Sequence, residues 1–175
     1  MHLPRFINFS SSSFLTIAFA WLWGLTWLVY WGSLDNPFYF DDRVFILKNP
    51  VIQDFAEIMR GFGRLFSSGR SFPLLTFHFN YAIHGFEVTG YHIVNTCIHA
   101  LNACLVFLLI RRLLPEENVS GWIPLGAASL FTVHPLMSSS VLYITQRSGL
   151  LAALFYLLAF ISYLKMRDST APLHK

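Results

Sequence analysis

The sequence predicts an all-α integral membrane protein with about four transmembrane helices and an outer-face loop. Hydrophobic residues make up 55% of the 175-residue chain and charged residues only 12%, about half the share of roughly 25% that is typical of soluble domains. Apolar runs also reach the roughly 18 residues that a spanning helix requires. The small net charge of +3 lies mainly beside these runs, which indicates membrane orientation and argues against nucleic acid as a partner.

Four apolar segments are predicted to cross the membrane, at residues 14–31, 91–114, 121–144 and 148–164. The first is uncharged and ends in Trp and Tyr side chains, which are typical of the membrane interface. The third is interrupted at His134-Pro135, so we expect it to be short, kinked or re-entrant. The segments form one membrane module over residues 1–175, with membrane lipids and other membrane-protein subunits as expected partners.

Basic residues beside the spans predict the orientation of the chain. If the four spans alternate, one side of the membrane receives Arg5, Arg111, Arg112, Lys165, Arg167 and Lys175. Basic residues near short loops favour the cytoplasmic side. We therefore expect both termini in the cytoplasm, and we expect the loop at residues 32–90 on the periplasmic side of a bacterial inner membrane.

The loop at residues 32–90 is expected to contain two interfacial helices. Apolar residues recur at helical spacing over residues 51–66, with charged residues between them. A second helix is expected at residues 74–84, after a break at Ser71-Phe72-Pro73. The loop would then form a compact cap over the spans.

The acidic pair Asp41-Asp42 is the leading candidate for chemistry in the chain. Adjacent carboxylates at a membrane surface can act as a general base, hold a divalent cation or bind a sugar hydroxyl. The alternative is that both side chains cap or hydrogen-bond the loop. No second acidic cluster completes a site for Mg or Mn, so we predict no metal.

The second span carries four polar residues at helical spacing on one face, namely His92, Asn95, His99 and Asn102. Such a face must contact protein or a cavity rather than lipid. It could form a substrate-facing wall, or His99 could ligate a pigment or haem. The alternative that we favour is hydrogen bonding between helices that fixes their packing.

His134 has two interpretations of the same kind. It could lie at the outer mouth of a cavity near a substrate phosphate, or it could satisfy backbone carbonyls where Pro135 interrupts the helix. We favour the second. Cys97 and Cys104 lie two turns apart on one helix, too far for a disulfide between them.

Five sequence blocks occur in the order found in a known group of proteins. They are FDDRVFILKNP, RSFPLLTFHFNYAIHG, GYHIVNTCIHALN, FTVHPL and VLYITQRSGLLAALFYLLAF, and they cover roughly residues 38–164. The chain resembles the N-terminal membrane region of bacterial tetratricopeptide-repeat proteins similar to protein O-mannosyltransferases, in the GT-C glycosyltransferase superfamily. The resemblance implies many membrane helices, an acidic motif in the first outer loop and a lipid-phosphate-linked sugar as donor.

The resemblance also implies roles for particular residues. Asp41 or Asp42 would act as the base in transfer of a sugar from a polyprenyl-phosphate donor to a hydroxyl acceptor. Substrate-binding residues near the departing phosphate would be Arg43, Arg70, His134 and Arg147. Many relatives have Glu or Gln where this chain has Ser139, which weakens the case for a role of that loop in substrate orientation.

Two classes of function follow from these observations. Relatives continue through more membrane helices and usually into soluble repeats, whereas this chain stops at Lys175. We therefore expect a GT-C-like opening module that lacks most of the catalytic domain and serves as an accessory or structural subunit of a larger membrane complex. The alternatives are a subunit of a split glycosyltransferase and, ranked lower, a haem- or pigment-associated subunit.

We predict that the purified chain alone transfers no sugar from a polyprenyl-phosphate donor, because the helices that complete the donor cavity in relatives would be missing. The measurement is incorporation of labelled sugar into a hydroxyl acceptor in detergent or vesicles. Measurable transfer by the chain alone would contradict the prediction.

Overall fold

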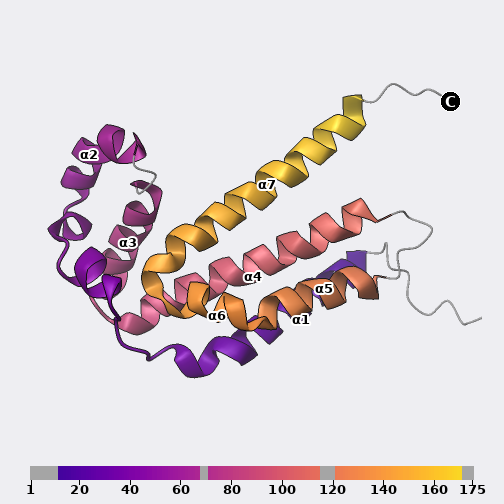
Figure 1. Cartoon of the computed structure of the whole chain (residues 1–175), viewed down its shortest axis with the longest axis horizontal. Helices are drawn as coiled ribbons and strands as arrows, with labels where there is room; N and C mark the ends of the chain where they lie inside the picture. Colours follow the sequence, from indigo (N-terminus) through magenta and orange to yellow (C-terminus); the bar gives the residue numbers. More distant parts are fainter. Residues whose placement is uncertain (1–11, 68–70, 115–120, 171–175) are drawn as a thin grey trace, which may run out of the picture.

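The computed structural model describes residues 12–67, 71–114 and 121–170, and every regular element there is helical (Figure 1). This confirms the predicted all-α membrane fold class. The α-helices are α1 (Ser12–Tyr30), α2 (Phe55–Ser67), α3 (Ser71–His84), α4 (Val88–Leu113), α5 (Trp122–Val133), α6 (Pro135–Leu142) and α7 (Arg147–Thr170). Short helical segments join them, namely η1 (Trp31–Ser33), η2 (Arg43–Leu47), η3 (Pro50–Gln53) and η5 (Ile144–Gln146).

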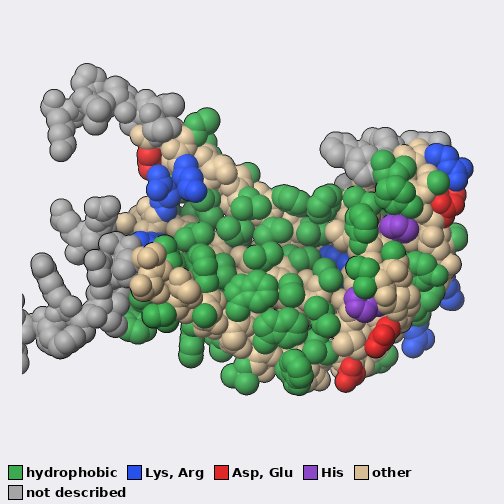
Figure 2. Space-filling view, turned by 180° about the vertical axis from the view of Figure 1, so that it is seen from behind, with side chains coloured by type: hydrophobic (Ala, Val, Ile, Leu, Met, Phe, Trp, Pro, Cys, Tyr) green, Lys and Arg blue, Asp and Glu red, His purple; other side chains and the backbone are tan. Residues whose placement is uncertain are grey.

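Three stretches of the described chain are long and apolar enough to cross a membrane, at Ser12–Ser33, Val88–Leu113 and Ile144–Asp168. The pair α5 and α6 passes the same test together but is bent by 57°. The spanning helices alternate in direction, and α2 and α3 lie together at one end of the bundle (Figure 1). A broad band of hydrophobic side chains covers the middle of the molecule, with charged groups gathered at both ends (Figure 2).

The bend between α5 and α6 follows from Pro135. A residue before proline is disfavoured in the helical region, and His134 accordingly has an extended backbone with φ −64° and ψ 129°. The His134 side chain then caps the new helix, because its Nδ1 accepts from the Leu136 N–H at 3.2 Å. We expected this side chain to satisfy carbonyls; instead it accepts from a backbone donor.

The polar face of α4 bonds to backbone carbonyls of the neighbouring segments. His92 Nε2 lies 2.9 Å from the Asn36 carbonyl oxygen, and His99 Nε2 lies 3.2 Å from that of Thr132. Asn95 donates to the carbonyls of both Val141 and Ile144 at 3.3 Å, and Asn102 donates to that of Leu150 at 3.0 Å.

Several of these carbonyls lie where a helix is interrupted. The Leu136 N–H, which would pair with the Thr132 carbonyl in a continuous helix, is taken by His134. His99 therefore supplies a partner that the break removed, and Asn95 does the same where α6 ends and α7 begins. Hydrogen bonding that fixes helix packing, the alternative that we favoured for the polar face of α4, accounts for these contacts.

Small residues bring α1, α4 and α5 close together below this polar layer. Ala18, Ala103 and Ala128 are completely buried in one cluster with Leu22 and Phe107. Small side chains allow helix backbones to approach closely in membranes, where packing rather than hydrophobicity drives association. This cluster fixes the bundle away from the cap.

The cap, defined as residues 34–87, differs from expectation in where its helices begin. The helix predicted at residues 51–66 begins only at Phe55, because Asp54 Oδ1 accepts from the backbone N–H groups of Ala56 and Glu57 at 2.8 and 3.2 Å. The helix predicted at residues 74–84 begins earlier, at Ser71, since Pro73 falls in its first turn, where a missing N–H costs little.

Candidate functional site

The acidic pair lies on a constrained turn. Phe40, directly before it, has a φ of 38°, in the left-handed region that a bulky residue rarely adopts. The following segment η2 is a π-helix, a form that is rare and often found at functional sites. The strain thus lies at Phe40, whereas Asp42 has ordinary helical angles of φ −57° and ψ −37°, and the turn needs support from its surroundings.

Asp42 provides that support. Its side chain is buried, with 1% of the residue exposed, and it accepts from the backbone N–H groups of Tyr39 at 3.2 Å and Thr145 at 2.8 Å. The second bond joins the cap to the start of α7. Charge-assisted bonds of this kind are stronger than neutral ones. Asp42 therefore positions the loop, as the hydrogen-bonding alternative for this pair requires.

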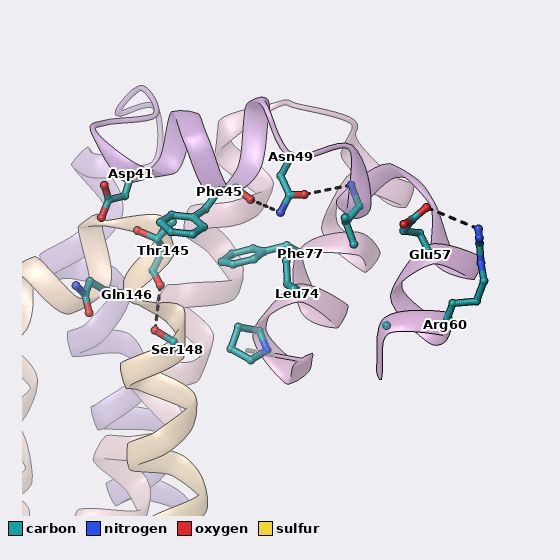
Figure 3. A pocket seen from close by; sticks show the side chains of 13 residues that line it. Asp41, Phe45, Asn49, Glu57, Arg60, Leu74, Phe77, Thr145, Gln146 and Ser148 are labelled. Carbon is teal, nitrogen blue, oxygen red and sulfur yellow. Dashed lines mark hydrogen bonds and ion pairs between the residues drawn. The ribbon is translucent and has the colours of Figure 1, made fainter. Parts of the chain in front are cut away.

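Asp41, by contrast, is one of the residues that line a cavity. Its backbone N–H donates to the Tyr143 hydroxyl at 3.0 Å, and the residue is exposed. The cavity has a volume of about 800 Å³ and is shown in Figure 3. It is lined by Asp41, Phe45, Asn49, Val51, Glu57, Arg60, Gly61, Pro73, Leu74, Phe77, Thr145, Gln146 and Ser148. The structure thus separates the two carboxylates by role.

The cavity has polar groups at two places and an apolar surface between them. Asp41 lies near Thr145, Gln146 and Ser148 at one end (Figure 3). Phe45, Leu74 and Phe77 form the middle, and Glu57 and Arg60 approach within 3.7 Å at the far end. Sequence reasoning missed Gln146, Glu57 and Arg60, although Gln146 stood in the QR pair of a quoted block.

Arg147 is completely buried and binds neutral groups on two other helices. Its Nε donates to Asn95 Oδ1 at 2.7 Å, and its Nη1 donates to Asn80 Oδ1 at 2.7 Å. Nη1 also contacts the carbonyl and hydroxyl oxygens of Thr76 at 3.3 and 3.4 Å, and Nη2 donates to the Tyr91 carbonyl at 3.0 Å. One guanidinium therefore joins α3, α4 and α7.

Arg147 lies behind the cavity wall and does not line the cavity itself. Its Cζ lies 4.4 Å from the centre of the Phe77 ring, which lines the cavity. Within the described ranges no carboxylate oxygen lies within 4.0 Å of the guanidinium. The positive charge of Arg147 lies behind the apolar middle of the cavity, so its contact with a substrate phosphate stays a prediction.

The other predicted substrate-binding residues lie elsewhere. Arg43 donates from Nε to the Phe38 carbonyl at 3.3 Å and is not among the residues that line the cavity. His134 caps α6. Arg70 falls outside the described residues, as do Arg5 and Lys175 of the orientation argument. Of the predicted site residues that the structure describes, Asp41 alone lines the cavity.

The residues present do not fit the cofactors considered for this chain. His99 is completely buried against the rings of Tyr30 and Phe131, at centroid distances of 5.5 and 5.2 Å, which leaves no space for a haem or pigment. Among the described residues no group of three or more His, Cys, Asp or Glu could hold a metal ion. Asp41 would offer Mg or Mn a single carboxylate where several oxygen ligands are needed.

Comparisons with known proteins found relatives that match most of the chain. The chain is 34% identical to protein O-mannosyl-transferase Tmtc1 of Drosophila melanogaster over 93% of its own length. It is equally similar to TMTC3 of Mus musculus and TMTC4 of Homo sapiens, at 34% over 79% and 76% of the chain. Its homologues are protein O-mannosyl-transferases. The predicted similarity to such enzymes is confirmed.

The match covers a limited part of each relative. The chain spans 20%, 16% and 21% of these three proteins, or about a fifth of their length. No family model matches the chain, and no solved structure matches it. The finding therefore supports a glycosyltransferase-like membrane module, and the activity of the whole relatives belongs to the proposals below.

We predict that Arg147→Lys lowers the free energy of unfolding by about 3 kcal/mol. An ammonium group cannot form all the hydrogen bonds of the planar guanidinium, so buried acceptors would lose their partner. The measurement is thermal unfolding of the purified chain by circular dichroism. Arg60→Lys, at a side chain that is 71% exposed, is the matched control and should unfold like the parent. Equal stability of the two variants would contradict the central role of Arg147.

Proposed function

We propose that this chain forms part of a glycosyltransferase site of the O-mannosyltransferase type. It supplies the acidic wall at which a sugar moves from a polyprenyl-phosphate donor to a hydroxyl acceptor. The observation that supports this most is that the exposed Asp41 lines a cavity of about 800 Å³, while the buried Asp42 bonds the same loop to Thr145. Similarity to protein O-mannosyl-transferases over most of the chain supports the reaction class.

In this proposal Asp41 is the general base. Its carboxylate takes the proton of the acceptor hydroxyl as that oxygen bonds to the anomeric carbon of the sugar. The bond between the sugar and phosphate breaks at the same time, and the phosphate leaves with the electron pair. Arg60 at the far end of the cavity and the buried charge of Arg147 favour the developing negative charge.

Further helices are needed to enclose a long polyprenyl chain, so we propose that additional membrane helices pack against the described ones. The module would then sit in a larger membrane assembly. An apolar recess on α1 suits such packing, since it is lined by Gly24, Trp27, Leu28, Trp31 and Gly32. A Cβ added at Gly24 or Gly32 would meet nothing within 4 Å, so a neighbouring helix could approach closely there. This recess also favours a second candidate, a non-catalytic accessory subunit.

We further propose that the membrane is the bacterial inner membrane, with the cap on the periplasmic side and both termini in the cytoplasm. The last turns of α4 and α7 support this orientation, because they carry Arg111, Arg112 and Arg167 at the end of the bundle opposite the cap. Excess Lys and Arg beside short loops marks the cytoplasmic side of membrane proteins.

We predict that Asp41→Asn abolishes the chain-dependent glycan in producing cells while the chain still assembles. The amide cannot accept the acceptor proton, and the exposed side chain holds no part of the fold. Asp42→Asn should instead lower the amount of folded chain, because an amide has one acceptor oxygen for the two backbone donors and its NH2 group would face the other donor. The measurements are glycan detection and chain abundance by immunoblot. Full glycan in the Asp41→Asn strain would refute the base role.

We predict that the chain extracted in mild detergent migrates with other membrane polypeptides in a stable assembly. Size-exclusion chromatography of a tagged chain from its native membrane is the measurement. Gly24→Trp should weaken the association by filling the recess on α1, whereas Gly126→Trp on α5, where an added Cβ likewise meets nothing, is the control. A free monomer in mild detergent would count against the assembly.

A further inference from the structure

Gln146 occupies a fixed position in the wall of the cavity. Its N-terminal neighbour, Thr145, donates its backbone N–H to the buried Asp42 at 2.8 Å. Its C-terminal neighbour is the buried Arg147, and its own N–H donates to the Tyr143 carbonyl at 3.0 Å. The backbone of Gln146 is therefore held on both sides, which sets the place from which its side chain enters the cavity.

The side chain of Gln146 is not fixed in the way that its backbone is. Gln146 is an exposed residue that lines the cavity on the same side as Asp41 (Figure 3). Within the described ranges its amide makes no hydrogen bond to the protein, while Thr145 and Arg147 on either side are bonded. With its backbone anchored and its amide unbonded within the described ranges, Gln146 can bond a ligand that enters the cavity.

The chemistry of the two side chains is complementary. An ionised carboxylate only accepts hydrogen bonds, whereas a primary amide offers two donors and an oxygen acceptor. Adjacent hydroxyls of a sugar ring can donate to one group and accept from the other. Phe45 and Leu74, in the apolar middle of the lining, provide surface for the C–H groups of such a ring. An anion would be repelled at this end by Asp41.

We propose that Gln146 is a substrate contact, whose amide binds the hydroxyls of one hexose ring together with the Asp41 carboxylate. This inference rests on the proposed function and adds the residue that selects a neutral sugar at this end of the cavity. The charged groups at the other end, Glu57 and Arg60, then face the part of the substrate beyond the ring.

Binding of methyl α-D-mannopyranoside to the whole chain in lipid nanodiscs tests the proposal, with saturation-transfer NMR as the measurement. Sugar-based detergents are excluded from the preparation because they would compete. We expect Gln146→Met, which keeps the length of the side chain and removes its hydrogen bonds, to weaken binding about tenfold. Because Gln146 is exposed, the variant should keep the thermal unfolding of the parent.

Gln53→Met is the matched control, since Gln53 is the other glutamine of the chain, lies in the cap and does not line the cavity. It should bind like the parent. The proposal is overturned if Gln146→Met binds the glycoside as the parent does, or if the parent binds none. It is also overturned if inorganic phosphate binds the parent and is lost in Gln146→Met, because the amide would then serve an anion.

The outcome can be separated from that for the base role of Asp41. Glycan loss in the Asp41→Asn strain measures transfer, whereas the nanodisc experiment measures binding by a residue on a different segment. Asp41-dependent glycan together with unchanged glycoside binding in Gln146→Met would retain the proposed function and refute this inference alone.

Discussion

The buried guanidinium of Arg147 is the interaction on which the rest of the structure depends. It donates to groups on α3 and α4 from the first residue of α7, so three helices that are distant in sequence meet at one side chain. Placing a positive charge in an apolar interior is costly unless hydrogen bonds replace its hydration. Asn80, Asn95 and the Tyr91 carbonyl provide that replacement without neutralising the charge.

The same need for hydrogen-bond partners explains how an interrupted helix is tolerated in a membrane. Backbone groups freed at the bend before Pro135 must find partners in protein, because lipid offers none. His99 and Asn95 on α4 supply them, which ties the position of α4 to breaks in other helices. Thr145, Gln146 and Ser148, which line the cavity, lie at the junction of α6 and α7. The polar face of α4 therefore positions this wall, although α4 does not line the cavity.

Composition and apolar runs were sufficient to predict the fold class, because membrane spans leave a strong signal in sequence. The break at Pro135 was also visible, since proline acts locally. The roles of Asp41 and Asp42 could not be separated, because the distinction arises from a bond between Asp42 and Thr145, residues far apart in sequence. The hydrogen bonds of Arg147 could not be predicted for the same reason, since its partners lie on α3 and α4.

The bond between Asp42 and Thr145 also has a consequence for biogenesis. The two residues are 103 positions apart, so the carboxylate is synthesised well before its partner. Until the last described helix enters the membrane, Asp42 has no Thr145 N–H to bind and the cavity lacks one wall. Asp42 therefore lacks this partner while the segments between them, α4 and the bent pair of α5 and α6, are inserted. The bond between Asp42 and Thr145 therefore forms late, when the helix bundle is completed rather than when the acidic pair is synthesised.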